Sequence, residues 1–208
     1  MREKDLDKEK SIIDEVSRII LKEGIADVSM SKIAKASGIS SSTIYVYFSD
    51  KEDLLKQVYL AKKRQLAAFL SQNINTKPNN SVKFVQQFMY ALYDFGMQYY
   101  EALMIIEQFN NSPILDSLKI KKEESYQGFE QLFEAVKHTP EFVISSPAVI
   151  LGFVYAPIVL FVKALKTRQI DNKTIMIDQV VVMCMNALLK NKISEHDIFL
   201  SIIKRLFD

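Results

Sequence analysis

Side chains suited to catalysis or metal binding are scarce in this chain of 208 residues. The single cysteine, Cys184, and the two histidines, His138 and His196, lie far apart in the sequence. These three residues are too few for a usual structural zinc site, and one cysteine cannot form an intramolecular disulfide. Motifs for phosphate loops, zinc proteases and serine hydrolases are absent from the sequence. We therefore expect no catalytic residue, no metal site and no cofactor, in a protein that is not an enzyme and works in a reducing compartment.

Hydroxyl and tyrosine side chains gather instead in one short segment, SMSKIAKASGISSSTIYVYF, at residues 29–48. Gly38 can adopt the left-handed backbone that a tight turn between two helices needs. Ile44 and Phe48 are four residues apart and share one helix face, which leaves Ser42, Val46 and, at the flank, Tyr45 pointing away from that face. Two short helices joined in this way form a helix-turn-helix, whose second helix can enter the major groove of DNA.

Helical periodicity recurs along the rest of the chain, and no segment shows the sustained alternation of a β-strand. The predicted helices cover residues 6–23, 30–37, 41–48, 51–72, 82–100, 100–109, 113–137, 147–166, 173–190 and 194–207. Ser29 and Ser40 are predicted N-caps, and Ser49 with Glu52 is a predicted capping box. The expected fold is all-α with about ten helices. A three-helix N-terminal unit (residues 1–50) precedes a larger helical domain for ligand binding and dimerisation (residues 51–208).

Residues 33–55, IAKASGISSSTIYVYFSDKEDLL, resemble the TetR family of bacterial repressors. They follow the family's pattern of Ile-Ala, Gly-Ile-Ser, Thr-Ile-Tyr-x-Tyr-Phe and Lys-Glu-x-Leu-Leu. Met30 and Ser42 depart from the residues that are common at their positions. The resemblance implies a cytoplasmic homodimer that binds an inverted-repeat operator in double-stranded DNA. It also implies that a small hydrophobic effector releases the protein from the operator.

The resemblance assigns DNA contacts to hydroxyl, tyrosine and lysine side chains of the motif: Ser29, Ser31, Ser41, Ser42, Thr43, Tyr45, Tyr47 and Lys51. Hydroxyl groups and helix N-termini make many of the positioning contacts to phosphate, so these roles are chemically reasonable. Residues 1–50 carry eight basic and nine acidic side chains, so a strongly basic stripe is not expected, although Lys32, Lys35 and Lys51 can form a local patch. Specificity must then come from hydroxyl, tyrosine and DNA-shape contacts.

Aromatic and methionine side chains are dense between residues 82 and 133, where they form either an ordinary core or the lining of an adaptable apolar pocket. The resemblance implies an effector site in this part of the chain. The candidate residues are Phe88, Tyr93, Met104, Glu107, Tyr126, Phe129, Phe133 and Tyr155. Glu107 would select a cationic or hydrogen-bonding ligand, or else it is solvated or paired with a lysine. The alternative function is an effector-free helix-turn-helix protein that a protein partner controls.

Two C-terminal segments, residues 147–166 and 173–190, are too apolar to face water on all sides. Residues 142–162 carry no formal charge, but serine and proline residues interrupt the apolar run, so we expect no membrane partner. The resemblance implies that the two segments meet a second copy in a four-helix bundle, and burial in the protein's own core is the alternative. The predicted interface residues are Val149, Phe153, Val181, Cys184 and Leu188.

Overall fold

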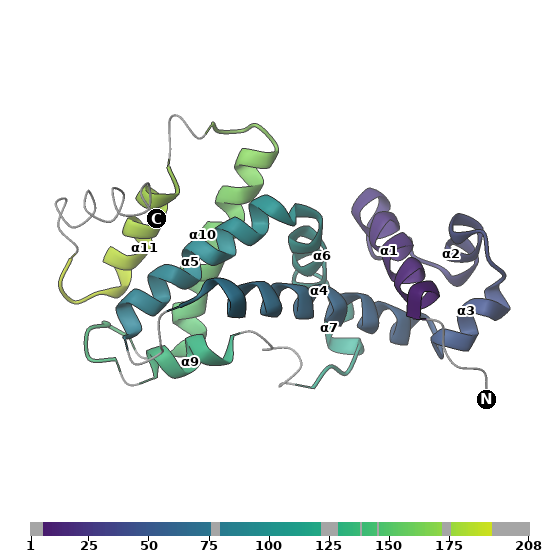
Figure 1. The fold of residues 1–208 in the computed structure, drawn as a ribbon, viewed down its shortest axis with the longest axis horizontal. Helices are drawn as coiled ribbons and strands as arrows, with labels where there is room; N and C mark the ends of the chain where they lie inside the picture. Colours follow the sequence, from purple (N-terminus) through teal and green to yellow (C-terminus); the bar gives the residue numbers. More distant parts are fainter. Residues whose placement is uncertain are drawn as a thin grey trace. The chain divides into compact units, whose positions relative to one another are not determined.

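The computed structural model describes residues 6–75, 80–121, 129–137, 139–144, 146–171 and 176–192. Their regular structure is helical, apart from one isolated bridge between Phe142 and Leu189 (Figure 1). The helices are α1 (Leu6–Glu23), α2 (Met30–Ser37), α3 (Ser41–Tyr47), α4 (Lys51–Asn73), α5 (Ser81–Gln98), α6 (Tyr100–Asn110), α7 (Ile114–Ser117), α9 (Glu130–Val136), α10 (Pro147–Lys166) and α11 (Ile177–Leu188). The predicted all-α fold with about ten helices is confirmed in this part of the chain.

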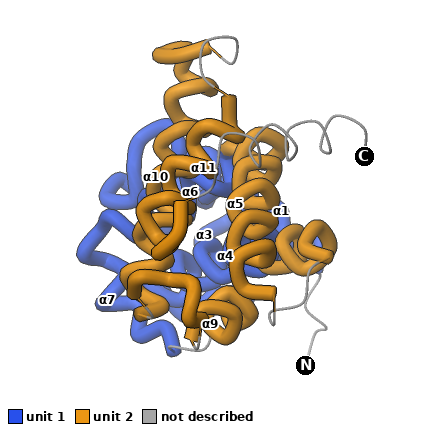
Figure 2. Tube along the Cα trace, turned by 90° about the vertical axis from the view of Figure 1, so that its left-hand side faces the viewer, with its two compact units in different colours: residues 1–66, 101–127 blue, residues 67–100, 128–208 orange. Residues whose placement is uncertain are grey.

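Two compact units divide the chain (Figure 2). Unit 1 comprises residues 1–66 and 101–127, which hold α1 to α3, most of α4 and of α6, and α7. Unit 2 comprises residues 67–100 and 128–208, which hold the end of α4, α5 and α9 to α11. This division groups residues into spatially compact units and does not test where a DNA-binding domain ends. A functional boundary after residue 50 stays a prediction.

The core of unit 1 joins the apolar stripe of α1 to the inner faces of α2 and α3. Ile12, Val16 and Ile20 recur every four residues and are at most 1% exposed, so they bury one face of α1. Ile33 of α2 and Ile44 of α3 are fully buried. Helix α1 packs on α2, and α2 packs on α3. The apolar pattern of α1 therefore holds the two short helices in place.

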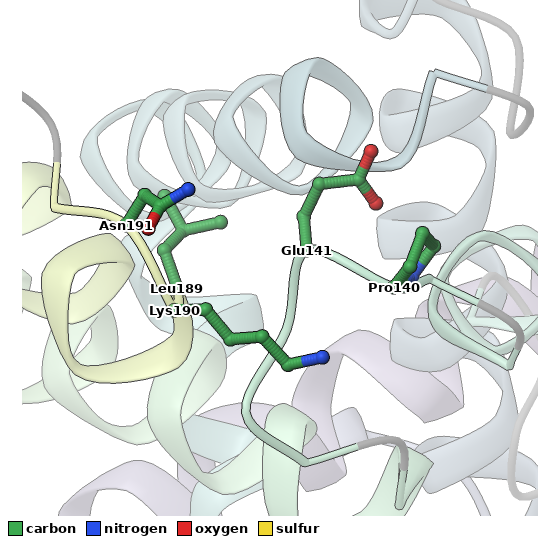
Figure 3. Close-up of a pocket in the computed structure, with 5 residues that line it drawn as sticks. All are labelled: Pro140, Glu141, Leu189, Lys190 and Asn191. Carbon is green, nitrogen blue, oxygen red and sulfur yellow. The ribbon is translucent and has the colours of Figure 1, made fainter.

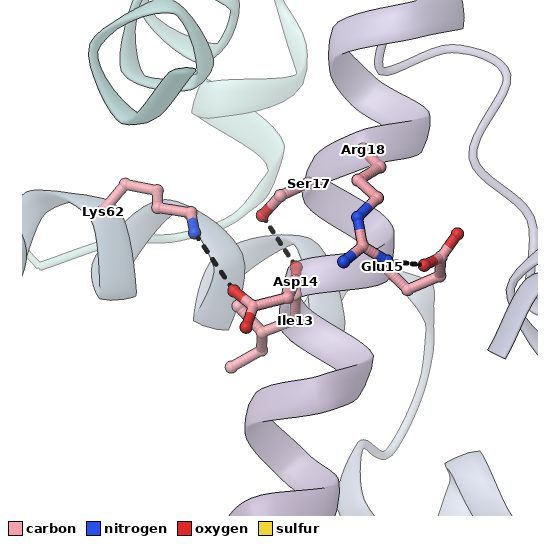
Figure 4. Close-up of polar contacts among 6 residues, drawn as sticks. All are labelled: Ile13, Asp14, Glu15, Ser17, Arg18 and Lys62. Atoms are coloured by element: carbon pink, nitrogen blue, oxygen red, sulfur yellow. Dashed lines mark hydrogen bonds and ion pairs between the residues drawn. The ribbon is translucent and has the colours of Figure 1, made fainter. Parts of the chain in front are cut away.

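Polar contacts tie α1 to other helices of unit 1. Lys62 of α4 forms an ion pair with Asp14 of α1, with 3.6 Å between Nζ and Oδ1 (Figure 4). The hydroxyl of Ser17 donates to a carbonyl of its own helix at 2.7 Å (Figure 4). Gln108 of α6 donates from Nε2 to the carbonyl of Ile20 at 3.0 Å, and this carbonyl also accepts the Gly24 N–H at 2.9 Å at the end of α1. Both α4 and α6 thus hold the helix that supports α2.

Unit 2 is built around α5 and α10, which pack on each other and on both α9 and α11. Phe84, Phe88 and Phe95 of α5 are at most 1% exposed and form much of its core. The buried carboxylate of Asp178 in α11 accepts a hydrogen bond from the hydroxyl of Tyr90 at 2.8 Å. Among the described residues, α10 is the one helix that is long and apolar enough to cross a membrane, and 33% of its apolar window is buried. Much of the apolar surface of α10 is therefore exposed in one chain.

One predicted helix is interrupted in the structure. Residues 113–137 were expected to form a single helix, but α7 ends at Ser117 and Lys119 has a φ of 47°. A left-handed residue cannot continue a right-handed helix, so α7 and α9 are separate. The predicted helix over residues 194–207 lies outside the described residues.

The capping box at the start of α4 is also shifted from its predicted position. The carboxylate of Asp50 accepts the Asp53 N–H at 2.8 Å, so Asp50 rather than Ser49 is the N-cap. The carboxylate of Asp53 accepts the Ser49 N–H at 2.9 Å, so Asp53 takes the role predicted for Glu52. Aspartate and serine are equally good N-caps, so the sequence alone did not distinguish Asp50 from Ser49 as the capping residue.

Candidate nucleic-acid interface and effector region

A tight turn between α2 and α3 determines the direction of α3. Gly38 has a φ of 67°, a left-handed backbone that other residues adopt at a cost. The Ile39 N–H donates to the Ala34 carbonyl at 3.1 Å and closes the end of α2. A Cβ atom added to Gly38 would meet no atom within 4 Å. The turn therefore needs glycine for its backbone conformation, as the sequence predicts, and not for lack of space.

Helix α3 presents two different faces within unit 1. Ile44 and Phe48 are 0% and 1% exposed and belong to the core, whereas Tyr45 and Val46 are 54% and 60% exposed. Ser42, one turn before Val46, is exposed as well. The prediction that this second face points away from the core is confirmed. The helix carries no charged side chain, so the face offers hydroxyl, phenol and methyl groups.

Hydroxyl groups at the starts of α2 and α3 already have hydrogen-bond partners. Ser29 Oγ accepts the Lys32 N–H at 3.3 Å, and Ser40 Oγ accepts the Thr43 N–H at 3.1 Å, which confirms both predicted N-caps. Ser40 Oγ also lies 2.8 Å from Ser42 Oγ and 2.8 Å from Thr43 Oγ1. Any DNA contact by these hydroxyls has to be added to this network or to replace part of it.

The other predicted DNA-contact residues lie in the same unit. Ser31 is exposed, and its hydroxyl is 3.3 Å from that of Ser29. Ser41 and Tyr47 are half-buried at the two ends of α3. Lys51 is the first residue of α4 and is half-buried too. All the predicted residues therefore belong to α2, α3, the start of α4 or the caps before these helices, and their DNA contacts stay predictions.

An ion pair between α1 and α2 was not predicted from the sequence. Lys32 donates from Nζ to the carboxylate of Glu23. This hydrogen bond lowers the pKa of Glu23 and raises the pKa of Lys32. The two residues lie on different helices, so no helical spacing in the sequence signals the pair. Lys32 was expected to contribute to a basic patch, but a carboxylate beside it compensates its charge.

Three of the predicted effector residues form a row of aromatic rings in unit 2. The ring centroids of Phe88 and Phe129 are 5.5 Å apart, and those of Phe129 and Tyr155 are 6.0 Å apart. Tyr93 packs instead against Phe161, with 6.0 Å between the centroids. The row joins α5 to α10 through the residue that precedes α9. The structure therefore brings together Phe88, Phe129 and Tyr155.

The remaining predicted effector residues are placed elsewhere. Two of them lie in α6 of unit 1, one is half-buried in α9 of unit 2, and one lies outside the described residues: Met104, Glu107, Phe133 and Tyr126. The half-buried Glu107 accepts a hydrogen bond from Asn110 Nδ2 at its Oε1, at 3.2 Å. Asn110 Oδ1 in turn accepts the hydroxyl of Tyr59 at 3.2 Å. Glu107 thus belongs to a polar chain of contacts inside unit 1.

Two surface hollows occur in unit 2. The first has a volume of about 290 Å³ and is lined by Pro140, Glu141, Leu189, Lys190 and Asn191 (Figure 3). The second has a volume of about 530 Å³ and is lined by Met97 and the segment after α10, including Arg168. Neither hollow is lined by the predicted effector residues.

The predicted dimer residues fall into two groups. Val149 and Phe153 of α10 are 40% and 44% exposed. Val181, Cys184 and Leu188 of α11 are 1%, 7% and 1% exposed, because they pack in the interior of their own protomer. Burial also raises the pKa of the Cys184 thiol. These three residues have little exposed surface in a single protomer, and their contact with a second copy stays a prediction.

Comparisons with known proteins agree with the helix-turn-helix geometry. The profile of bacterial regulatory proteins of the tetR family matches residues 12–58. The fatty acid metabolism regulator protein of Bacillus subtilis is 36% identical over 66 residues, which are 32% of this chain and 34% of that protein. An HTH-type transcriptional regulator of Staphylococcus aureus is 30% identical over 111 residues, which are 52% of this chain and 58% of that protein. The chain thus spans between about a third and three fifths of the length of these two relatives.

The same likeness extends to the fold of the larger part of the chain. A TetR family transcription regulator from Marinobacter aquaeolei, solved as a crystal structure, is 21% identical with a TM-score of 0.75. The similarity covers 92% of this chain and 100% of that one. The family profile therefore coincides with the helix-turn-helix of unit 1, and the fold continues as in a TetR regulator beyond it. Residues 12–58 thus match the DNA-binding domain of the tetR family of bacterial regulatory proteins, and the chain as a whole has the fold of a TetR regulator.

Proposed function

We propose that this protein is a transcriptional repressor that binds double-stranded DNA as a homodimer. The observation that carries the proposal is the exposed face of α3, with Ser42, Tyr45 and Val46 on a helix whose opposite face is buried. The major groove is about 12 Å wide and admits an α-helix. A recognition helix brings its N-terminal residues to the base edges while its neighbours contact the backbone. The packing of α2 on α3, with one face of α3 exposed, supports this proposal.

Phosphate contacts are proposed for the residues that flank the recognition helix. Lys51 is the first residue of α4, next to the Asp50 carboxylate that caps this helix, and its ammonium group is proposed to bind a phosphate. Tyr45 and Tyr47 carry hydroxyls that can donate to phosphate oxygens. The acidic and basic side chains of residues 1–50 nearly balance, so non-specific affinity should be modest and specificity should depend on close contacts.

The contact with the second copy is proposed on the exposed apolar surface of α10 and α11. Phe153, Leu160 and Met183 are 44%, 65% and 72% exposed, although all three are large and apolar. Contiguous apolar surface on one protomer usually marks an interface. A two-fold dimer presents the same recognition helix twice, which requires an inverted-repeat operator. On this proposal α10 lies in a protein interface rather than in a membrane, and the protein acts in the cytoplasm.

A small hydrophobic effector is proposed to bind in unit 2 beside the row of Phe88, Phe129 and Tyr155. The relative from Bacillus subtilis is named for fatty acid metabolism, so fatty acids and their thioesters are the first compounds to test. A ligand releases DNA only if it binds more tightly to a conformation that does not fit the operator. Coupling of about 1–3 kcal/mol between the two sites would lower operator affinity about 5–150-fold.

An effector-free regulator controlled by a protein partner is the second candidate function. It is favoured by the way the predicted effector residues pack: Phe88 and Phe129 are 1% and 3% exposed and fill space against each other. A ligand would have to displace these contacts before it could bind. The two candidates differ in one measurable respect, since only the first predicts a compound that both stabilises the protein and weakens its binding to DNA.

The test begins with a mobility-shift assay on the DNA upstream of the protein's own gene. Tyr45→Ala and Lys51→Ala should weaken binding without lowering thermal stability much, and Lys51→Ala should reduce the salt dependence by about one phosphate contact. Val143→Ala, at an exposed position in a loop of unit 2, is the matched control. Absence of a sequence-specific complex, or full binding by both variants, would contradict the proposal.

A second measurement separates the two candidate functions. A thermal-shift screen with fatty acids, acyl thioesters and hydrophobic cations should yield a stabilising compound if the effector proposal holds. The same compound should then release the DNA. A protein that binds its operator but responds to none of these compounds would favour control by a protein partner.

A further inference from the structure

The recognition helix α3 lacks the side chains that usually read bases by paired hydrogen bonds. Base-edge recognition commonly uses arginine or lysine on guanine, asparagine or glutamine on adenine, and an acid on cytosine. None of these residue types occurs in Ser41–Tyr47. Sequence reading by α3 therefore depends on its hydroxyl, phenol and methyl groups.

The hydroxyl groups at the start of α3 already form hydrogen bonds within the protein. Ser40 Oγ lies 2.8 Å from Ser42 Oγ and 2.8 Å from Thr43 Oγ1. Ser40 Oγ also accepts a backbone N–H and so caps the helix. A hydroxyl both donates and accepts, so these groups can touch a base edge without distinguishing well between bases. They serve α3 mainly by fixing its start.

Val46 is an exposed apolar side chain on this face, and its conformation is restricted. It is 60% exposed, one turn beyond Ser42 and opposite the buried stripe of Ile44 and Phe48. A β-branched side chain in a helix strongly prefers one rotamer, so the two methyl groups of Val46 have a defined direction. An exposed valine contributes little to the core of unit 1. Its chemistry suits an apolar partner outside the protein.

We infer that Val46 recognises the C5-methyl group of a thymine, so that each half of the operator carries an A·T pair opposite this residue. The inference rests on the proposed DNA-binding function and adds its base preference. Among the four bases, thymine alone presents a methyl group in the major groove. Contact between this methyl and the methyls of Val46 removes apolar surface of both partners from water. Tyr45, beside Val46 and 54% exposed, can cover the same contact from the flank.

The experiment uses the full chain and a duplex selected by the protein from a random DNA library. Each thymine of the selected half-site is replaced in turn by deoxyuridine, which removes the methyl group and keeps every hydrogen-bonding group. At one position the replacement should weaken binding about fourfold in one half-site and about sixteenfold in both, from the transfer free energy of one methyl-sized group. At the other thymines it should change affinity little.

Val46→Ala supplies the decisive comparison. In this variant the deoxyuridine penalty at the marked position should disappear, whereas Val143→Ala, an exposed valine outside α3, should retain it in full. If deoxyuridine is tolerated at every position by the wild-type protein, the inference is overturned while DNA binding stands. The same holds if the penalty persists in Val46→Ala. If no duplex is selected at all, the proposed function fails and the inference fails with it.

Discussion

Replacing Glu23 with glutamine should make operator binding tighter at low salt and more dependent on salt. In the structure Lys32, next to Ser31 in the first turn of α2, donates to the carboxylate of Glu23. This carboxylate compensates the lysine charge and would repel a phosphate nearby. A neutral amide at position 23 leaves the charge of Lys32 available to the DNA backbone.

The magnitude follows from the number of phosphates neutralised. Each phosphate contact steepens the dependence of log affinity on log salt by about 0.9, and a two-fold dimer has two copies of Lys32. The slope of Glu23→Gln should therefore be steeper than that of the wild type by about 1.8. Between about 50 and 200 mM salt, the advantage of the variant should then shrink about twelvefold.

Fluorescence anisotropy with the selected operator, measured over this range of salt, gives both slopes directly. Glu134→Gln is the matched control, because it breaks an exposed ion pair between Glu134 of α9 and Lys137, the residue after this helix in unit 2. The double variant Glu23→Gln with Lys32→Ala should lose the extra slope. Equal slopes for Glu23→Gln and the wild type would refute the reasoning, because Lys32 would then not reach a phosphate.

The same ion pair has a signature in folding stability. The hydrogen bond from Lys32 holds the pKa of Glu23 below its usual range. Its contribution is therefore present above the pKa of Glu23 in the unfolded chain and is lost as the pH falls through the lower pKa of the folded state. Urea denaturation from neutral to acid pH should show the wild type losing slightly more stability than Glu23→Gln. The effect should be small, since the pair is exposed to solvent.

Three further outcomes are expected. Leu160→Glu combined with Met183→Glu should give monomers in sedimentation velocity, because both side chains are exposed apolar groups of the proposed interface, and an intact dimer would exclude this surface. Gly38→Ala should lower the free energy of unfolding by about 1–2 kcal/mol, since the left-handed backbone is costly for alanine, and Gly38→Asn should lower it less; equal stability of all three proteins would contradict the role of the turn. The thiol of Cys184 should react slowly with a thiol reagent at neutral pH and rapidly after denaturation, because burial raises its pKa and shields it; fast reaction of the native protein would count against this burial.

Local signals made the helix-turn-helix predictable from the sequence. Ser29 and Ser40 are capping residues placed directly before helical runs, and both cap in the structure. Gly38 is the residue type that a left-handed turn requires, and its φ is 67°. Ile44 and Phe48 identified the buried face by their spacing alone. Each of these signals depends on neighbours within about one helical turn, which a sequence displays directly.

Features that depend on distant partners were not predictable in the same way. Residues 118–127 contain no glycine or proline that would signal the left-handed backbone at Lys119, so a continuous helix over 113–137 was predicted. Helix α11 is apolar around most of its circumference, so its pattern did not reveal that Val181 faces inward while Met183 is 72% exposed. The pair of Glu23 and Lys32 joins two helices, and only the crossing of these helices brings the two side chains together.

The two faces of α3 also bear on how such a regulator evolves. Ile44 and Phe48 pack in the core of unit 1, whereas Tyr45 and Val46 are more than half exposed and contribute little to it. Substitutions at Tyr45 and Val46 should therefore have little effect on folding stability. After a gene duplication, a copy could drift toward a new target site through single, thermodynamically neutral changes on this face. The range of operator sequences that such a lineage could recognise would then be restricted by the geometry of the DNA grooves rather than by folding stability.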